Sequence, residues 1–233
     1  MSALELLRGG LVVSVQAEAD SPLNAPTTIA ALCRVAVANG AAGVRVEGAA
    51  RLGAARRAVA VPVIGIVKRA YAGFEPYITA SEREIAEVVA AGAEIVAFDA
   101  TPRARPGGRD VAAVIGAIHA RGRLAMADCA DAEDVRRAAA AGADAVATTL
   151  CGYTAATRGT PLPALDLVRV AAAQGAFAIC EGGVAGPGDV RAAFEAGAAA
   201  VVVGTAITNV DALVRRFVAA APLPGSAARP RDS

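Results

Sequence analysis

The sequence predicts a single-domain α/β fold, a (β/α)8 TIM barrel of the phosphate-binding type, and two observations carry this prediction. One pattern occurs four times: a glycine able to end a helix, then a short apolar run. These glycines stand at positions 40, 92, 142 and 197, at intervals of 52, 50 and 55 residues. Four further apolar runs lie between them, at 11–15, 61–67, 123–127 and 176–180. Eight strands alternating with helical segments favour a closed parallel barrel.

The segments between the strands carry helix start signals. Ser81 and Glu84 have the spacing of a capping box, and Asp131 precedes a second helical segment. A doubly wound open sheet stays an alternative, although residues 181–186 lack the G-x-G-x-x-G spacing of a dinucleotide site. We expect the barrel domain over residues 1–220. The stretch 221–233, with its Pro, Gly, Ser and Arg residues, is expected to be a disordered tail.

Composition narrows the classes of function. The net charge is +1 with interspersed charges, and there are three Tyr and no Trp, so a nucleic-acid partner is not expected. The four cysteines lie far apart and there is one His, which predicts neither a metal site nor a disulfide framework. The chain lacks both a signal-peptide pattern and an apolar run of membrane-spanning length. We therefore expect a cytoplasmic protein without a membrane partner.

Lys68 is the most informative single residue, because the other 22 of the 23 basic residues are arginine. It directly follows the apolar run 62–67. Arginine stays protonated in proteins, whereas a partly desolvated lysine can lose its proton and act as a base or nucleophile. The plain alternative is a strand-ending cation whose stem covers apolar surface. Rarity and position together favour the chemical role.

Polar residues follow every predicted strand, where barrel enzymes build their sites. The strand ends are Ser14 and Gln16, Arg45 and Glu47, Lys68, Asp99, Asp128, Thr148 and Thr149, Glu181, and Gly204 with Thr205. The turns after the last two strands predict a phosphate site of backbone N–H groups, comprising Gly182, Gly183, Gly204 and Thr205. The alternative is a pair of ordinary glycine-containing turns.

From about Gly10 to Thr208 the chain resembles the N-acetylmannosamine-6-phosphate 2-epimerase family of bacterial sialic-acid catabolism. The segments that carry the resemblance include Ser14-Val15-Gln16, Val44-Arg45-Val46-Glu47-Gly48, Gly65-Ile66-Val67-Lys68-Arg69, Asp99-Ala100-Thr101-Pro102-Arg103 and Thr148-Thr149-Leu150-Cys151-Gly152-Tyr153-Thr154. The resemblance implies that Lys68 is the acid/base, that Glu181 is a second catalytic group, and that substrate contacts come from Gln16, Arg45, Asp128 and Thr149. Gly183 and Gly204 would donate backbone N–H groups to the phosphate.

Two positions depart from the family pattern. Gly183 stands where relatives often carry a longer side chain, and Asn209 where they commonly carry Arg. Arg45 and Arg69 are the candidates to compensate for the lost charge.

The expected activity is epimerisation of N-acyl-D-mannosamine 6-phosphate to N-acyl-D-glucosamine 6-phosphate at C2, by removal and return of a proton. This chemistry requires no redox or metal cofactor. The expected partner is a small phosphorylated amino sugar, and a homodimer is the assembly considered. Two alternatives remain at this point: a Schiff-base lysine barrel of the aldolase or synthase type, and a non-catalytic phosphosugar-binding barrel.

Overall fold

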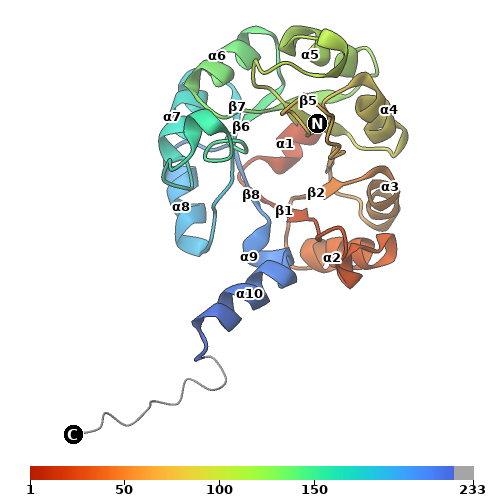
Figure 1. Cartoon of the computed structure of the whole chain (residues 1–233), viewed down its shortest axis with the longest axis vertical. Coiled ribbons are helices and arrows are strands. Elements are labelled where there is room, and N and C mark those ends of the chain that lie inside the picture. Colours follow the sequence, from red (N-terminus) through yellow and green to blue (C-terminus); the bar gives the residue numbers. More distant parts are fainter. Residues whose placement is uncertain (223–233) are drawn as a thin grey trace, which may run out of the picture.

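The computed structural model describes residues 1–222, and these form a closed barrel of eight parallel strands, which confirms the predicted fold (Figure 1). The strands follow one another around the barrel in chain order, and β8 pairs with β1. They are β1 (Leu11–Val15), β2 (Gly43–Glu47), β3 (Val63–Ile66), β4 (Ile95–Asp99), β5 (Leu124–Asp128), β6 (Ala145–Ala147), β7 (Phe177–Glu181) and β8 (Ala200–Val203).

Helices surround this barrel, as the alternating sequence pattern requires (Figure 1). Those that follow the strands are α2 (Pro26–Ala38), α3 (Ala49–Ala58), α4 (Glu82–Ala90), α5 (Val111–His119), α6 (Ala132–Ala140), α7 (Leu165–Ala173), α8 (Pro187–Glu195), α9 (Thr205–Thr208) and α10 (Val210–Ala220). Ser81 and Glu84 form the predicted capping box of α4, and the Asp131 side chain accepts from two N–H groups at the start of α6.

Successive side chains of each strand point alternately into the barrel and out toward the helices. Val12, Ile64, Ile66, Ile95 and Met126 belong to the cluster that fills the barrel interior. A larger cluster of buried apolar residues lies between strands and helices. The interior is therefore a packed core, and only its upper layer, at the carboxyl ends of the strands, is polar.

A short N-terminal helix, α1 (Ala3–Leu7), lies at the centre of the barrel in Figure 1. Its Leu4 and Leu7 are buried in the interior cluster, and Leu7 has no exposed surface. Gly43, the first residue of β2, has no side chain at this point. A Cβ there would come within 2.5 Å of Leu7 Cδ2. The start of the chain thus forms the floor of the barrel, which the sequence pattern did not predict.

The last described helix, α10, extends away from the barrel (Figure 1). None of its residues is buried. It ends at Ala220, and residues 223–233 lie outside the described part of the chain, so the expected tail stays a prediction. Over residues 1–222, no helix combines the length and the apolar character needed to cross a membrane.

Candidate active site

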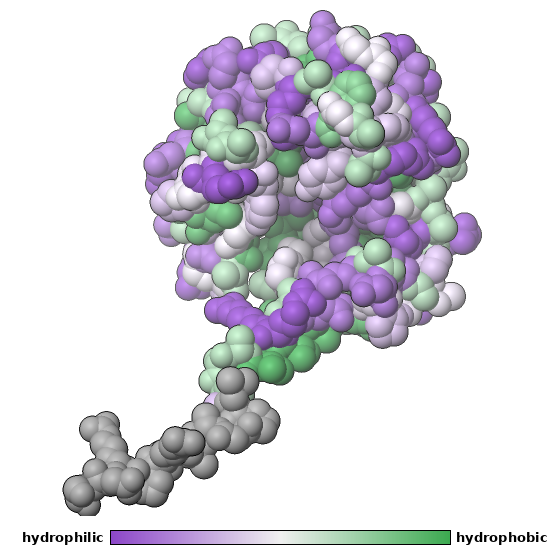
Figure 2. Space-filling view, viewed as in Figure 1, coloured by the Kyte–Doolittle hydropathy of each residue, from purple (hydrophilic) through white to green (hydrophobic). Residues whose placement is uncertain are grey.

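A cavity of about 620 Å³ opens at the carboxyl ends of the strands. Figure 2 shows this face of the molecule hollowed at its centre. The cavity is lined by nine of the ten residues predicted to form the site: Gln16, Arg45, Lys68, Thr149, Glu181, Gly182, Gly183, Gly204 and Thr205. Ser14 and Glu47 from the predicted polar ring also line it.

Strand alternation explains why these residues meet. Gln16 continues the inward series of Val12 and Ser14, and Lys68 continues that of Ile64 and Ile66. The same count of two places Arg45, Thr149, Glu181 and Gly204 on inward-facing positions at the top of their strands. Gly182, Gly183 and Thr205 follow in the turns after β7 and β8. The site therefore joins residues from distant parts of the chain, from Gln16 near its start to Gly204 near its end.

Arg45 is the centre of the charged cluster at the base of the cavity. Its guanidinium donates to both carboxylate oxygens of Asp128, over 3.0 and 2.7 Å, and to Glu181 Oε2 over 2.6 Å. Thr149 Oγ1 donates to Asp128 Oδ1 at 2.7 Å and lies 3.1 Å from Glu181 Oε2. Arg45 is 1% exposed. A buried cation with this geometry is fixed in place, and it orients the two carboxylates.

Glu181 is the carboxyl group best suited to hold a proton near neutral pH. Desolvation is the largest influence and outweighs the opposing charge of Arg45; with a further contribution from Asp128, it raises the pKa of Glu181 to about 7. Its Oε2 accepts from Arg45 and lies 3.1 Å from Thr149 Oγ1. Within residues 1–222 no group donates a hydrogen bond to Oε1, so this oxygen remains available to a molecule in the cavity.

Lys68 faces the same cavity, directly after β3. Its side chain reaches an open mouth, yet the surrounding protein partly desolvates it. This desolvation and the charge of Arg45 lower the pKa of the Lys68 ammonium, and nearby carboxylates oppose the change. The Lys68 backbone N–H donates to Glu47 Oε1 over 3.3 Å. In the part of the chain that the structure describes, the ammonium makes no ion pair.

Asp128 is the tenth residue predicted to form the site. It has no exposed surface and does not line the cavity, and the substrate contact that the resemblance implied stays a prediction. Its carboxylate is occupied by Arg45 and Thr149. Asp128 therefore supports the site from below by holding Arg45.

The glycine turns after β7 and β8 form the other end of the cavity. Gly182 and Gly183 both have positive φ angles, 100° and 72°, which favour glycine. A Cβ on Gly183 would also come within 2.3 Å of Leu162 Cβ. Among the described residues, neither Gly183 nor Gly204 finds an acceptor for its backbone N–H. These N–H groups are available for an anion, and the departure at Gly183 has a local steric reason.

Arg45 and Arg69 were the candidates to supply the positive charge that relatives carry at the position of Asn209. Both form ion pairs with carboxylates of this chain. Arg45 lines the base of the cavity and is held in ion pairs with Asp128 and Glu181. Arg69 pairs with Glu84 and Glu87 of α4 and does not line the cavity. Asn209 caps α10, because its side chain accepts from Ala212 N at 2.9 Å. Both arginines are thus held by carboxylates in this structure, and compensation by Arg45 or Arg69 stays a prediction.

Comparison with known proteins decides the family. Residues 29–222 match the family model described as "Putative N-acetylmannosamine-6-phosphate epimerase". The chain belongs to this epimerase family. A protein named "Putative N-acetylmannosamine-6-phosphate 2-epimerase" from Synechococcus elongatus is 46% identical over 221 residues, which cover 93% of this chain and 95% of the relative. The family match favours the epimerase over the two alternative functions.

Solved structures agree with this assignment. The N-acetylmannosamine-6-phosphate 2-epimerase from Clostridium perfringens superimposes with a TM-score of 0.91 at 35% identity, covering 95% of this chain and 97% of that one. Thiamine phosphate pyrophosphorylase from Pyrococcus furiosus shares only the fold, with a TM-score of 0.58 at 13% identity over 87% of each chain.

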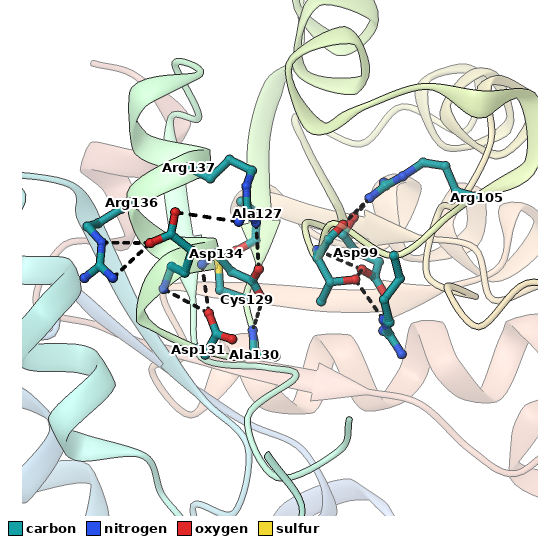
Figure 3. A network of polar contacts seen from close by, with 12 residues as sticks. Asp99, Arg105, Ala127, Cys129, Ala130, Asp131, Asp134, Arg136 and Arg137 are labelled. Carbon is teal, nitrogen blue, oxygen red and sulfur yellow. Dashed lines mark hydrogen bonds and ion pairs between the residues drawn. The ribbon is translucent and has the colours of Figure 1, made fainter. Parts of the chain in front are cut away.

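Asp99, one of the predicted polar strand ends, has a structural task in this family member (Figure 3). Its carboxylate accepts from Thr101 Oγ1 at 2.6 Å and from Arg103 at 2.7 Å. Arg105 donates to the Asp99 carbonyl at 2.7 Å and to the Thr101 carbonyl at 2.6 Å. These bonds anchor the loop 102–108, and Asp99 does not line the cavity of this epimerase.

The sequence analysis did not assign five polar side chains that line the cavity of this epimerase: Glu18, Tyr77, Tyr153, Thr208 and Arg216. Tyr77 arrives through the loop after β3, which folds back so that Ile78 pairs with Lys68 in an isolated antiparallel bridge. No strand or helix periodicity marks such a loop. Arg216 lies on α10, and helical spacing from Asn209 could have indicated it.

Proposed function

We propose that Lys68 and Glu181 interconvert N-acyl-D-mannosamine 6-phosphate and N-acyl-D-glucosamine 6-phosphate by moving the proton on C2. The observation that carries this proposal is that the two groups line one cavity with opposite pKa shifts. The lowered pKa of Lys68 favours a neutral amine, and the raised pKa of Glu181 favours a protonated carboxyl. Each shift favours the protonation state that the proposed role of its residue requires.

The chemistry sets the order of events. C2–H becomes acidic only when the sugar ring opens and the C1 aldehyde lies beside it. Lys68 Nζ then takes the proton, and the electron pair of the C–H bond moves onto the C1 oxygen as an enolate. Glu181 gives a proton to C2 from the opposite face, and the C1 carbonyl re-forms. The oxidation state of the sugar is unchanged, so no electron donor or acceptor enters the balance.

The remaining cavity residues have supporting roles in this proposal. Arg45 holds the Glu181 carboxyl in place and lends positive charge near the enolate. Gln16, whose amide donates to Ser14 Oγ at 2.8 Å, and Thr149 contact the sugar. The turns Gly182–Gly183 and Gly204–Thr205 bind the phosphate through backbone N–H groups. This arrangement would fix C2 between Lys68 and Glu181.

Solvent deuterium exchange tests the assignment of Lys68. The protein is incubated with N-acetylmannosamine 6-phosphate in deuterated buffer, and C2 is followed by NMR. Wild type should incorporate deuterium at C2, and Lys68→Ala should not. Lys68→Arg keeps the charge but cannot offer a neutral amine, so it should also be inactive. Arg136→Ala on α6, outside the cavity, is the control. Near-normal exchange in Lys68→Ala would remove Lys68 from the mechanism.

The lowered pKa of Lys68 also suits nucleophilic attack on a carbonyl, which is the Schiff-base alternative. Borohydride reduction in the presence of the substrate separates the two chemistries. Proton transfer leaves Lys68 unmodified, as read by mass spectrometry of the intact protein. A stable adduct on Lys68 would indicate an imine and contradict the proposed mechanism.

We infer that the protein forms a homodimer through the outer face of α10. Val210, Val214, Phe217 and Val218 on this helix are 45–75% exposed, and Figure 2 shows hydrophobic residues where it leaves the barrel. Apolar side chains gathered on one helix face are typical of a contact surface. Light scattering should give a dimer mass for wild type and a lower mass for Phe217→Ser. A monomeric wild type at micromolar concentration would contradict this inference.

The absence of a nucleic-acid partner and the cytoplasmic location expected from the sequence remain predictions.

A further inference from the structure

One cation that lines the cavity was not identified by the sequence analysis. Three basic residues line the cavity: Arg45, Lys68 and Arg216. Arg45 is buried in its ion pairs, and Lys68 stands after β3, where the proposed proton transfer occurs. Arg216, on α10, is exposed. It has no ion-pair partner among residues 1–222.

The direction of Arg216 follows from the geometry of α10. Asn209, Ala212, Leu213 and Arg216 all line the cavity, and their spacing of three, one and three residues places them on one face of the helix. The exposed apolar residues of α10 occupy the remaining surface. α10 is therefore two-sided, and Arg216 is on the side that faces the cavity. The short helix α9 joins α10 to the Gly204 turn.

Arg215, the neighbour of Arg216, fixes this placement. Its guanidinium pairs with Glu18, which follows β1 and lines the same cavity; one of the two contacts is 3.0 Å long. The pair connects α10 to the barrel rim. It also neutralises a carboxylate that would otherwise repel an anion there.

We propose that Arg216 binds the phosphate of the substrate and gives the enzyme its selectivity for phosphorylated sugars; this inference rests on the proposed function. The turn amides of Gly183 and Gly204 provide directed donors but no full charge. A phosphate with a charge near −2 requires a counter-charge, and a guanidinium can donate two hydrogen bonds to it. Arg216 supplies this charge from a helix rather than from the turns themselves.

Steady-state kinetics of Arg216→Gln test the proposal. Because a charged hydrogen bond is removed, KM for N-acetylmannosamine 6-phosphate should rise about 10- to 100-fold. The value of kcat should stay within about threefold, since the reacting groups are untouched. Inhibition by inorganic phosphate should weaken by a similar factor. Any slow turnover of unphosphorylated N-acetylmannosamine should be unaffected. Arg216→Lys keeps the charge without the planar fork and should give an intermediate KM.

Arg136→Gln, an exposed arginine on α6 outside the cavity, is the matched control. An unchanged KM and unchanged phosphate inhibition in Arg216→Gln would overturn the proposal. Equal losses with both sugars would overturn it too, because they would indicate a general defect. Failure of the proposed function is distinct, since it would be seen as absence of C2 exchange in wild type. In that case the phosphate affinities of wild type and Arg216→Gln, measured by calorimetry, still decide the role of Arg216.

Discussion

Replacing Glu181 by Gln should change how the stability of the barrel depends on pH. The pKa of Glu181 is about 7 in the folded protein, against 4.5 for an ordinary glutamate. Because the folded value is raised, the protonated carboxyl contributes stability below about pH 4.5, and this contribution is lost as pH rises through about 7. At about 1.4 kcal/mol per pKa unit, the loss between pH 5 and pH 8 is about 2 to 3 kcal/mol.

The side-chain amide introduced by Glu181→Gln would keep an acceptor for Arg45 Nη1 and Thr149 Oγ1 but could not ionise. The unfolding free energy of Glu181→Gln should therefore rise relative to wild type by about 2 to 3 kcal/mol from pH 5 to pH 8. Urea unfolding at several pH values, followed by circular dichroism, measures this difference. Glu133→Gln, at an exposed position of α6, is the control for removing any carboxylate. A difference between Glu181→Gln and wild type that is independent of pH would refute the reasoning.

Three further substitutions test other parts of the structure. Arg45→Met leaves two carboxylates without their buried cation; it should cost about 3 to 5 kcal/mol of unfolding free energy and abolish C2 exchange. Wild-type stability in this variant would contradict the central role of Arg45. Gly183→Ala would place a side chain at a positive φ and its Cβ 2.3 Å from Leu162 Cβ. It should therefore lower the unfolding free energy by about 1 to 3 kcal/mol, measured by urea unfolding, and raise KM. Gly43→Ala should cost about 1 to 3 kcal/mol of unfolding free energy, because the new Cβ would crowd Leu7. A double-mutant cycle should show a smaller cost in a Leu7→Ala background. The same cost in both backgrounds would exclude that contact.

The fold was predictable because the pattern of a glycine turn followed by an apolar run repeats along the chain. Four glycine turns and eight apolar runs indicate eight strands. This number favours a closed barrel over an open sheet, and the structure has the closed barrel. The inward direction of Gln16, Lys68 and Glu181 also follows from counting by two along each strand. The strand ends therefore indicated most of the residues that face the cavity, although Asp99 and Asp128 do not line it.

The burial of the polar strand-end residues and their ion-pair partners were less predictable from the sequence. Asp128 and Asp99 end adjacent strands in paired register, and both are fully buried, but one holds Arg45 and the other anchors a loop. This difference depends on which arginine reaches each carboxylate, and such contacts join distant parts of the chain. Arg216 was missed for a related reason, since its position depends on where α10 lies against the barrel rim.

The helix α1 closes the barrel at the amino ends of the strands. Leu4 and Leu7 belong to the same buried apolar cluster as Ile64 and Met126, so this short segment is part of the core. A chain that lacks its first eight residues would expose the apolar side chains packed against Leu4 and Leu7 to water, and its free energy of unfolding would fall. A truncation far from the substrate cavity would therefore weaken the whole barrel.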